Sequence, residues 1–229
     1  MSGAVAAHVQ TTSDRPAVTV RLASPPPLDR VLTVQSEPTG DDGVPVVRLL
    51  DGERLVATAG SAPAADAALG DVDAPPATYE EAAAAEKRYE GLADHPFPTC
   101  FACGTERDPG DALCLRPGPL DDGTGRHACR WQVPDGVDAP QVWAALDCPG
   151  GWSAGVAGRP MVLGTMTALV HTLPEPGTTS IVTAWQTGAQ GRRHWSATTV
   201  HSPDGRLVAR AAAVWIAVDP ATIRPTSHH

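Results

Sequence analysis

The stretch of sequence best suited to chemistry is LDCPGGWSAGVAGRP, residues 146–160, in which a lone carboxylate precedes a run of glycines. Asp147 is the only charged residue between Asp138 and Arg159, and its neighbours are mostly apolar. Partial burial would raise the pKa of this carboxyl group and make it a better general base near neutral pH. Aspartate is also a common helix N-cap, so a capping role is the alternative for Asp147.

The glycines that follow predict a second part of the same site. Pro149 suits the first turn of a helix, because its missing N–H is not needed there. Gly150 and Gly151 would come next, with backbone N–H groups that have no partner inside the helix. Together with the positive end of the helix dipole, these groups could stabilise an oxyanion. In the alternative, the glycines only let the helix lie close against a sheet.

A third candidate is the cysteine pattern in HPFPTCFACGTERDPGDALC, residues 95–114. Cys100 and Cys103 have CxxC spacing, and His95 and Cys114 could complete a four-ligand zinc site. There is no second CxxC, however, and Cys114 lies in an apolar run typical of a core. We therefore expect an ordered loop without zinc, and no redox role, because nothing around the motif predicts a βαβ unit.

The composition limits the classes of function. The chain has 229 residues, 42% of them hydrophobic, so it is long and apolar enough to bury a core. Its net charge of −9 argues against nucleic-acid and anionic-membrane partners, which need basic patches. We expect no membrane span and no signal peptide, and hence a cytoplasmic protein. Five cysteines, an odd number, do not predict a disulfide framework.

Local patterns predict the elements that must position these residues. Asp51-Gly52 predicts a hairpin turn between two apolar runs, because glycine accepts a positive φ. The strongest helix pattern covers residues 78–90, with Thr78 and Glu81 as a capping box and Gly91 as a stop. A strand is predicted at RHACRWQV, and long strands follow residue 160, with turns at 174–178 and 204–205.

The two halves of the chain share an order of elements. RPAV at residues 15–18 matches RPMV at 159–162, and DGERLVATA near residue 51 matches DGRLVARAA near residue 204. Such a match predicts two copies of one supersecondary unit, and chance similarity between hairpins is the alternative. The predicted organisation is an N-terminal repeat at 1–62, a connection at 63–125, a C-terminal repeat at 126–220 and a flexible tail at 221–229. The connection would hold a linker, helix 78–90 and the cysteine pattern.

A helix followed by antiparallel strands, duplicated in one chain, resembles the double hotdog fold of acyl-thioester enzymes. The resemblance is clearest over residues 126–218, where WAALDCPGGW is similar to the start of a central hotdog helix. With HPFPTCFACG, it is also similar to an actinobacterial group of thioesterase-like proteins. It implies an α+β fold in which antiparallel sheets each wrap a central helix. The N-terminal copy would lack its first strand and would begin in the middle of its helix.

This resemblance also implies roles for individual residues. Asp147 matches the carboxylate that acts as general base or nucleophile in hotdog thioesterases, and Thr165 matches an accessory threonine. The dehydratase branch has a histidine five residues after its aspartate, and Trp152 stands there, which counts against hydratase or dehydratase chemistry. Trp152 would instead line an acyl or pantetheine tunnel.

The implied substrate is an acyl thioester carried by coenzyme A or by an acyl-carrier protein. Arg192 and Arg193 are candidates for binding the phosphates of coenzyme A, because guanidinium groups suit phosphate. A solvated turn is the alternative for this pair. No cofactor is expected beyond the coenzyme A of the substrate, and two double hotdogs would form a homodimer. The expected function is thioester hydrolysis, with a non-catalytic module that binds an acyl thioester or a small hydrophobic ligand as the alternative.

Overall fold

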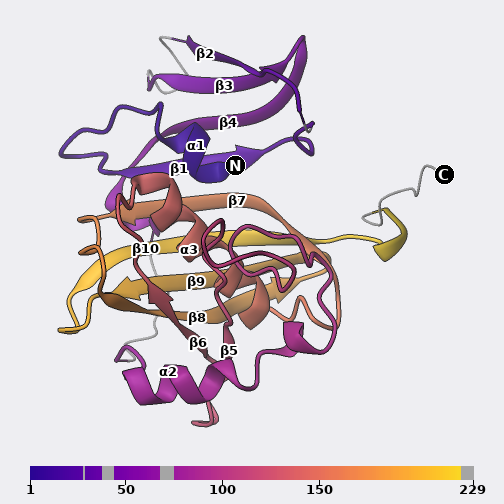
Figure 1. Cartoon of the computed structure of the whole chain (residues 1–229). Coiled ribbons are helices and arrows are strands. Elements are labelled where there is room, and N and C mark those ends of the chain that lie inside the picture. Colours follow the sequence, from indigo (N-terminus) through magenta and orange to yellow (C-terminus); the bar gives the residue numbers. More distant parts are fainter. Residues whose placement is uncertain (28, 38–43, 68–74, 223–229) are drawn as a thin grey trace.

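The computed structural model describes residues 1–27, 29–37, 44–67 and 75–222. Its strands form one ten-stranded sheet in the order β2-β3-β4-β1-β7-β10-β9-β8-β6-β5, and every neighbouring pair is antiparallel (Figure 1). The strands are β1 Ala17–Leu22, β2 Thr33–Glu37, β3 Val46–Asp51, β4 Arg54–Ala62, β5 Gly118–Pro119, β6 His127–Gln132, β7 Met161–Val170, β8 Thr179–Gln190, β9 Arg193–His201 and β10 Leu207–Ala217.

The two halves of the sheet have the same strand order when counted outward from the central β1–β7 pair. One side continues with β4, β3 and β2, and the other continues with β10, β9 and β8. The matching Arg-Pro pairs at 15–16 and 159–160 immediately precede β1 and β7. The predicted hairpin turns are confirmed, with Gly52 at φ 61° and Gly205 at φ 81°. The C-terminal half has two additional strands, β6 and the two-residue β5, for which the described N-terminal residues provide no equivalent.

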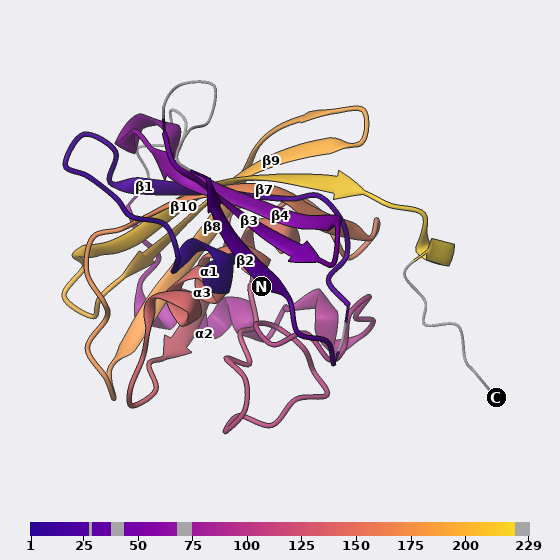
Figure 2. The same cartoon turned by 90° about the horizontal axis from the view of Figure 1, so that it is seen from above.

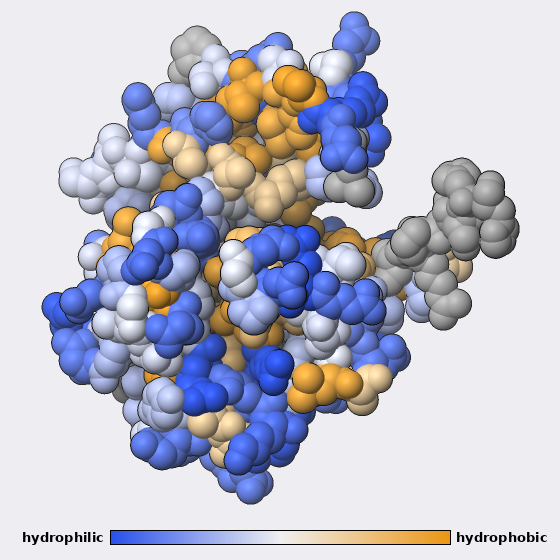
Figure 3. All heavy atoms as spheres, in the orientation of Figure 1, coloured by the Kyte–Doolittle hydropathy of each residue, from blue (hydrophilic) through white to orange (hydrophobic). Residues whose placement is uncertain are grey.

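Helices cover the two halves unequally. The long helix α3, Ala139–Ser153, packs against β6 to β10, whereas the five-residue α1, Ser2–Ala6, packs against α3, β1 and β4. Both helices lie on the same side of the sheet (Figure 2). Figure 3 shows apolar surface over the N-terminal strands, where the short α1 contacts β1 and β4. None of the helices in the described residues is long and apolar enough to cross a membrane.

Helix α3 begins ten residues earlier than the sequence predicts. Its N-cap is Asp138, whose carboxylate accepts from the Gln141 N–H at 2.9 Å, and the Gln141 side chain accepts from the Asp138 N–H in return. Pro149, expected at the helix start, lies in the interior. The buried stripe of Val142, Trp143, Ala145 and Leu146 packs on the sheet, and this burial outweighs the missing proline hydrogen bond.

Helix α2, Tyr79–Glu86, has the predicted capping box of Thr78 and Glu81. It ends at Glu86 rather than at residue 90, and Gly91 belongs to a separate 3-10 helix, Glu90–Leu92. The helix lies against β6, where Glu86 accepts from the Arg130 backbone N–H at 2.7 Å and pairs with its guanidinium at 2.6 Å. Two other short 3-10 helices are Ala64–Ala67 and Pro220–Thr222. Residues 68–74 of the expected linker and 223–229 of the expected tail lie outside the described residues.

Candidate functional site

A cavity of about 200 Å³ lies at the C-terminal half of α3, and we call it the Asp147 cavity. Helix α3 contributes Asp147, Cys148 and Trp152 to its wall. The opposite wall comes from the cysteine loop, which we define as residues 95–104, and from the facing ends of β7 and β10. The wall is mainly apolar, and none of the described residues that line it is a lysine or an arginine. Larger depressions lie among surface loops, but none of them includes Asp147.

Asp147 is the only carboxyl group in the described lining of this cavity. Burial raises the pKa of Asp147 to about 7, and the nearby Cys100 adds to the shift. A cap role for Asp147 is wrong, because the residue lies inside α3 and Asp138 caps that helix. A half-buried carboxyl group in an apolar wall can exchange a proton near neutral pH.

Gly150 and Gly151 occupy the last turns of α3, and the expectation that they follow a helix start is wrong. Inside a helix each N–H donates to the carbonyl four residues earlier, so these N–H groups are not free for an oxyanion. The structure favours the packing alternative. A Cβ on Gly150 would lie 2.5 Å from the Oγ of Ser196, and one on Gly151 would lie 3.0 Å from the ring of Trp215.

Trp152 lines the Asp147 cavity as a buried wall, with 2% of its surface exposed. Its indole N–H donates to the Sγ of Cys103 over 3.4 Å. Its ring meets Tyr89 and His95 edge to face, with centroids 4.6 and 5.1 Å apart. This residue therefore couples α3 to the cysteine loop.

Thr165 is not part of this site. The neighbouring Met166 belongs to the main core under α3, and side chains alternate along a strand, so Thr165 faces the other side of the sheet. Thr167, of the same parity, bonds to Thr19 at 2.8 Å, and Leu169 packs with Ala67 in a separate cluster. The accessory role expected for Thr165 beside Asp147 is therefore wrong.

Arg192 and Arg193 lie at the β8–β9 turn, where both are exposed. Arg192 donates from Nε to the Ala217 carbonyl at 2.9 Å, and both side chains line a shallow depression that does not include Asp147. The structure does not bring this pair to the candidate site, and the solvated turn describes it better.

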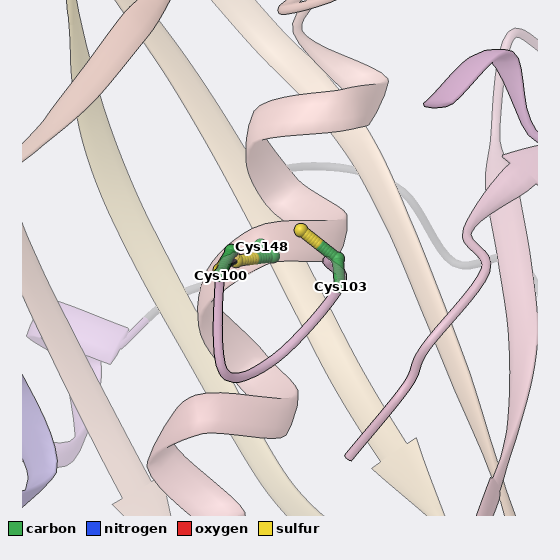
Figure 4. Close-up of side chains that lie close together, drawn as sticks. All are labelled: Cys100, Cys103 and Cys148. Carbon is green, nitrogen blue, oxygen red and sulfur yellow. Dashed lines mark hydrogen bonds between the residues drawn. The ribbon is translucent and has the colours of Figure 1, made fainter. Parts of the chain in front are cut away.

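Three thiols meet beside the cavity. The Sγ atoms of Cys100, Cys103 and Cys148 all lie within 4.8 Å of one another, and those of Cys100 and Cys148 are 3.4 Å apart (Figure 4). Cys148 was not among the predicted metal ligands. The predicted member Cys114 lies outside the group, with its thiol 3.7 Å from the Arg107 carbonyl. The fifth cysteine, Cys129, is buried in β6.

His95 is also outside the thiol group, and both of its ring nitrogens are engaged. Nδ1 lies 2.9 Å from the Phe97 N–H, which can only donate, so Nδ1 is an acceptor. Nε2 then carries the proton and donates to the Cys103 carbonyl at 3.1 Å. Burial lowers the pKa of His95, which favours this neutral form. The imidazole holds the cysteine loop rather than serving as a ligand of the group.

One signal in the sequence could have found the third thiol. Cys148 is the residue directly after the candidate base Asp147, so a cysteine must lie close to any site that contains Asp147. Its partners are 48 residues away in the chain, and no local pattern predicts that approach.

No protein-family model matches the sequence, and no curated protein matches it significantly. Solved structures do resemble the fold. An acyl-CoA thioesterase II, TesB2, from Mycobacterium marinum has a TM-score of 0.58 at 15% identity, over 90% of this chain and 81% of that one. A tesB protein of Mycobacterium avium subspecies paratuberculosis has a TM-score of 0.55 at 11% identity, over 89% and 78%.

A third solved structure is described by its fold. It is a conserved protein of unknown function with a hot dog fold from Alicyclobacillus acidocaldarius, with a TM-score of 0.50 at 15% identity over 89% of this chain and 78% of that one. Identities this low carry the fold and not the activity. The large antiparallel sheet around one central helix is thus similar in fold to these solved structures, one of which is described as a hot dog fold.

Proposed function

We propose that this protein binds acyl thioesters in the Asp147 cavity and hydrolyses them. The observation that carries the proposal is Asp147 itself, a half-buried carboxylate on the helix that the hotdog sheet surrounds. Phe97, Val156 and Leu163 line the same cavity and suit an acyl chain, because small-molecule sites combine apolar walls with few polar groups. The name of one similar structure, an acyl-CoA thioesterase II, points to the same class of substrate.

In this reaction Asp147 takes a proton from a water molecule as the water oxygen attacks the thioester carbonyl carbon. The tetrahedral intermediate then collapses, the carbon–sulfur bond breaks, and the leaving thiolate recovers the proton from Asp147. The products are a carboxylic acid and a free thiol. The helix amides of Gly150 and Gly151 do not enter this scheme, because they are bonded inside α3.

The architecture that we propose for this function is a double hotdog of the α+β class, produced by an internal duplication. The mirrored strand order around β1 and β7 supports it, as do the matching Arg-Pro pairs ahead of those strands. In this proposal residues 1–62 and 126–220 are the two repeats. Superposition of β1–β4 on β7–β10 tests it, and unlike strand paths would contradict it.

A non-catalytic binding module is the second candidate. One observation favours it: among the described residues that line the cavity, no imidazole or side-chain amide is free to assist Asp147. His95 lines the cavity, but both of its ring nitrogens are engaged, and no glutamine or asparagine is among the described residues that line it. Such a module would bind the thioester and release it unchanged.

The experiment compares wild type, Asp147→Asn and Asp138→Asn on acyl-CoAs of several chain lengths. Released coenzyme A is separated by chromatography, because thiol reagents would also react with the five free cysteines. We expect Asp147→Asn to lower turnover by about a hundredfold or more while binding persists. Asp138→Asn is the control on the same helix, because asparagine caps nearly as well as aspartate. Binding without hydrolysis by wild type would support the module, and full activity of Asp147→Asn would remove Asp147 from the mechanism.

A further inference from the structure

The proposed hydrolysis leaves the three clustered thiols without a role. Cys100 and Cys103 come from the cysteine loop and Cys148 comes from α3, so two distant parts of the chain meet at their sulfurs (Figure 4). We infer that Cys100, Cys103 and Cys148 form a zinc site with three thiolate ligands and a fourth position open to the Asp147 cavity.

The spacing of the sulfurs fits a tetrahedral ion. Zinc–sulfur bonds of about 2.3 Å in a tetrahedron separate the sulfurs by about 3.8 Å. The Cys100–Cys148 pair is 3.4 Å apart, and all three sulfurs lie within 4.8 Å of one another. Binding therefore requires only small movements of the side chains. Thiolates also select zinc among the common divalent ions, whereas oxygen ligands suit magnesium and calcium.

A hydrogen-bond donor already points at one of these sulfurs. The indole N–H of Trp152 donates to the Sγ of Cys103 at 3.4 Å. Donors of this kind stabilise a thiolate, which is the form of cysteine that binds metal.

The loop that carries two of the ligands is held in place from outside. The Tyr89 hydroxyl donates to the Cys103 carbonyl at 2.9 Å, and His95 donates to the same oxygen. The turn also requires glycine at position 104, where a Cβ would lie 2.4 Å from the Pro98 carbonyl oxygen. Outer groups that orient metal ligands in this way are a regular part of metal sites.

The fourth coordination position has no protein ligand among the described residues. No further His, Cys, Asp or Glu atom joins the sulfur group, and His95 is engaged elsewhere. All three cysteines line the Asp147 cavity, so the free position faces it. Zinc with three protein ligands completes its shell with water or a bound molecule.

A disulfide between Cys100 and Cys148 is the competing chemistry. It would shorten the 3.4 Å separation to about 2.05 Å and leave Cys103 as a single thiol with an indole donor. The experiment therefore begins with fully reduced protein under nitrogen.

The test measures metal content, so it does not depend on any hydrolytic activity. Reduced full-length protein is stripped of metal, loaded with zinc, dialysed and analysed by mass spectrometry. Wild type is compared with Cys103→Ser, Cys148→Ser and the control Cys114→Ser, whose thiol lies outside the group. We expect one zinc per chain in wild type and in Cys114→Ser. Cys103→Ser and Cys148→Ser each remove a ligand, so they should weaken zinc binding by more than about a hundredfold. A hundredfold is roughly the largest effect of losing a group that only orients a ligand.

Cobalt provides a second readout that needs no variant. Wild-type protein loaded with Co²⁺ should show intense sulfur-to-cobalt charge-transfer absorption and the visible bands of tetrahedral coordination. Folded, reduced wild type that takes up neither metal would overturn the inference, and so would unchanged zinc affinity in Cys148→Ser. Copper or iron retained at these thiols in place of zinc would overturn the assignment of the ion.

Discussion

The indole N–H of Trp152 donates a hydrogen bond to the Sγ of Cys103, and this contact joins helix α3 to the cysteine loop. The two residues are 49 positions apart in the chain. The ring of Trp152 is at the same time a wall of the Asp147 cavity and an aromatic partner of Tyr89 and His95. Two tryptophans with different N–H acceptors therefore allow the hydrogen bond to be separated from the packing.

Trp152→Phe removes the donor to Cys103 and keeps a smaller aromatic ring, so its control must lose the same ring volume. We expect zinc affinity to fall by about 10- to 100-fold, the usual effect of losing an outer-shell partner. Competition with a chelator of known affinity measures the change. Trp215→Phe is the matched control, because its N–H donates to Ser196 at 3.0 Å and not to a cysteine. Equal zinc affinities in the two variants would remove the Trp152–Cys103 bond from the site.

Gly150→Ala should destabilise the fold by about 1–3 kcal/mol, because the added methyl group overpacks the contact between α3 and β9. The new Cβ would lie 2.5 Å from Ser196 Oγ and 3.0 Å from Thr198 Oγ1. Urea unfolding measures the loss. Gly158→Ala is the control, since nothing lies within 4 Å of its added Cβ, and its stability should change by less than about 0.5 kcal/mol. Equal stabilities would show that α3 can move away from the sheet without cost.

Glu86→Ala should loosen α2 from the sheet. The Glu86 carboxylate accepts from both the backbone and the guanidinium of Arg130, and hydrogen bonds to charged groups each contribute about 1.5–3 kcal/mol. We expect faster amide hydrogen exchange in α2 and β6 than in β9 and β10. Glu80→Ala is the control on the exposed side of the same helix. Uniform exchange in both variants would contradict the anchoring role of Glu86.

Stability should fall in mild acid partly because of His127. Its Nδ1 is buried without a partner, and burial lowers the pKa of the imidazole. Below the ordinary histidine pKa of about 6.5 the unfolded chain binds a proton that the folded chain does not, so the free energy of unfolding decreases as pH falls. Urea unfolding at several pH values should therefore show a shallower decline for His127→Gln than for wild type. His171 is exposed, so the free energy of unfolding of the control His171→Gln should decline with pH as that of wild type does. The same dependence on pH in all three proteins would contradict this account.

The strands and turns of this fold follow from local sequence. Gly52 and Gly205 occupy hairpin turns with positive φ, and the capping box of Thr78 and Glu81 begins α2. These features were predictable because each depends on residues that are neighbours in the chain. The paired Arg-Pro motifs each precede a strand, β1 and β7, and the duplication that they predict stays a prediction.

The start of α3 and the thiol group were not predictable in the same way. Proline usually marks the first turn of a helix, yet Pro149 lies within α3 because the apolar face from Val142 to Leu146 is buried by the sheet. Burial against the sheet therefore sets where α3 begins. The oxyanion role expected of Gly150 and Gly151 is wrong because it required the helix to begin at Pro149. Cys148 meets Cys100 only through the folding of a loop onto a helix, a contact without any local signal.

The backbone pairing of β1 with β7 has a consequence for the chain as a whole. Val18 to Arg21 share a ladder with Thr165 to Ala168, so the two halves are continuous at the centre of the sheet. Separating the halves would expose two long strand edges, each of which could recruit another chain and cause aggregation. We therefore expect that neither half folds when it is expressed alone. The protein should unfold in a single cooperative transition, and a cut between residues 62 and 126 should be tolerated only while both fragments remain together.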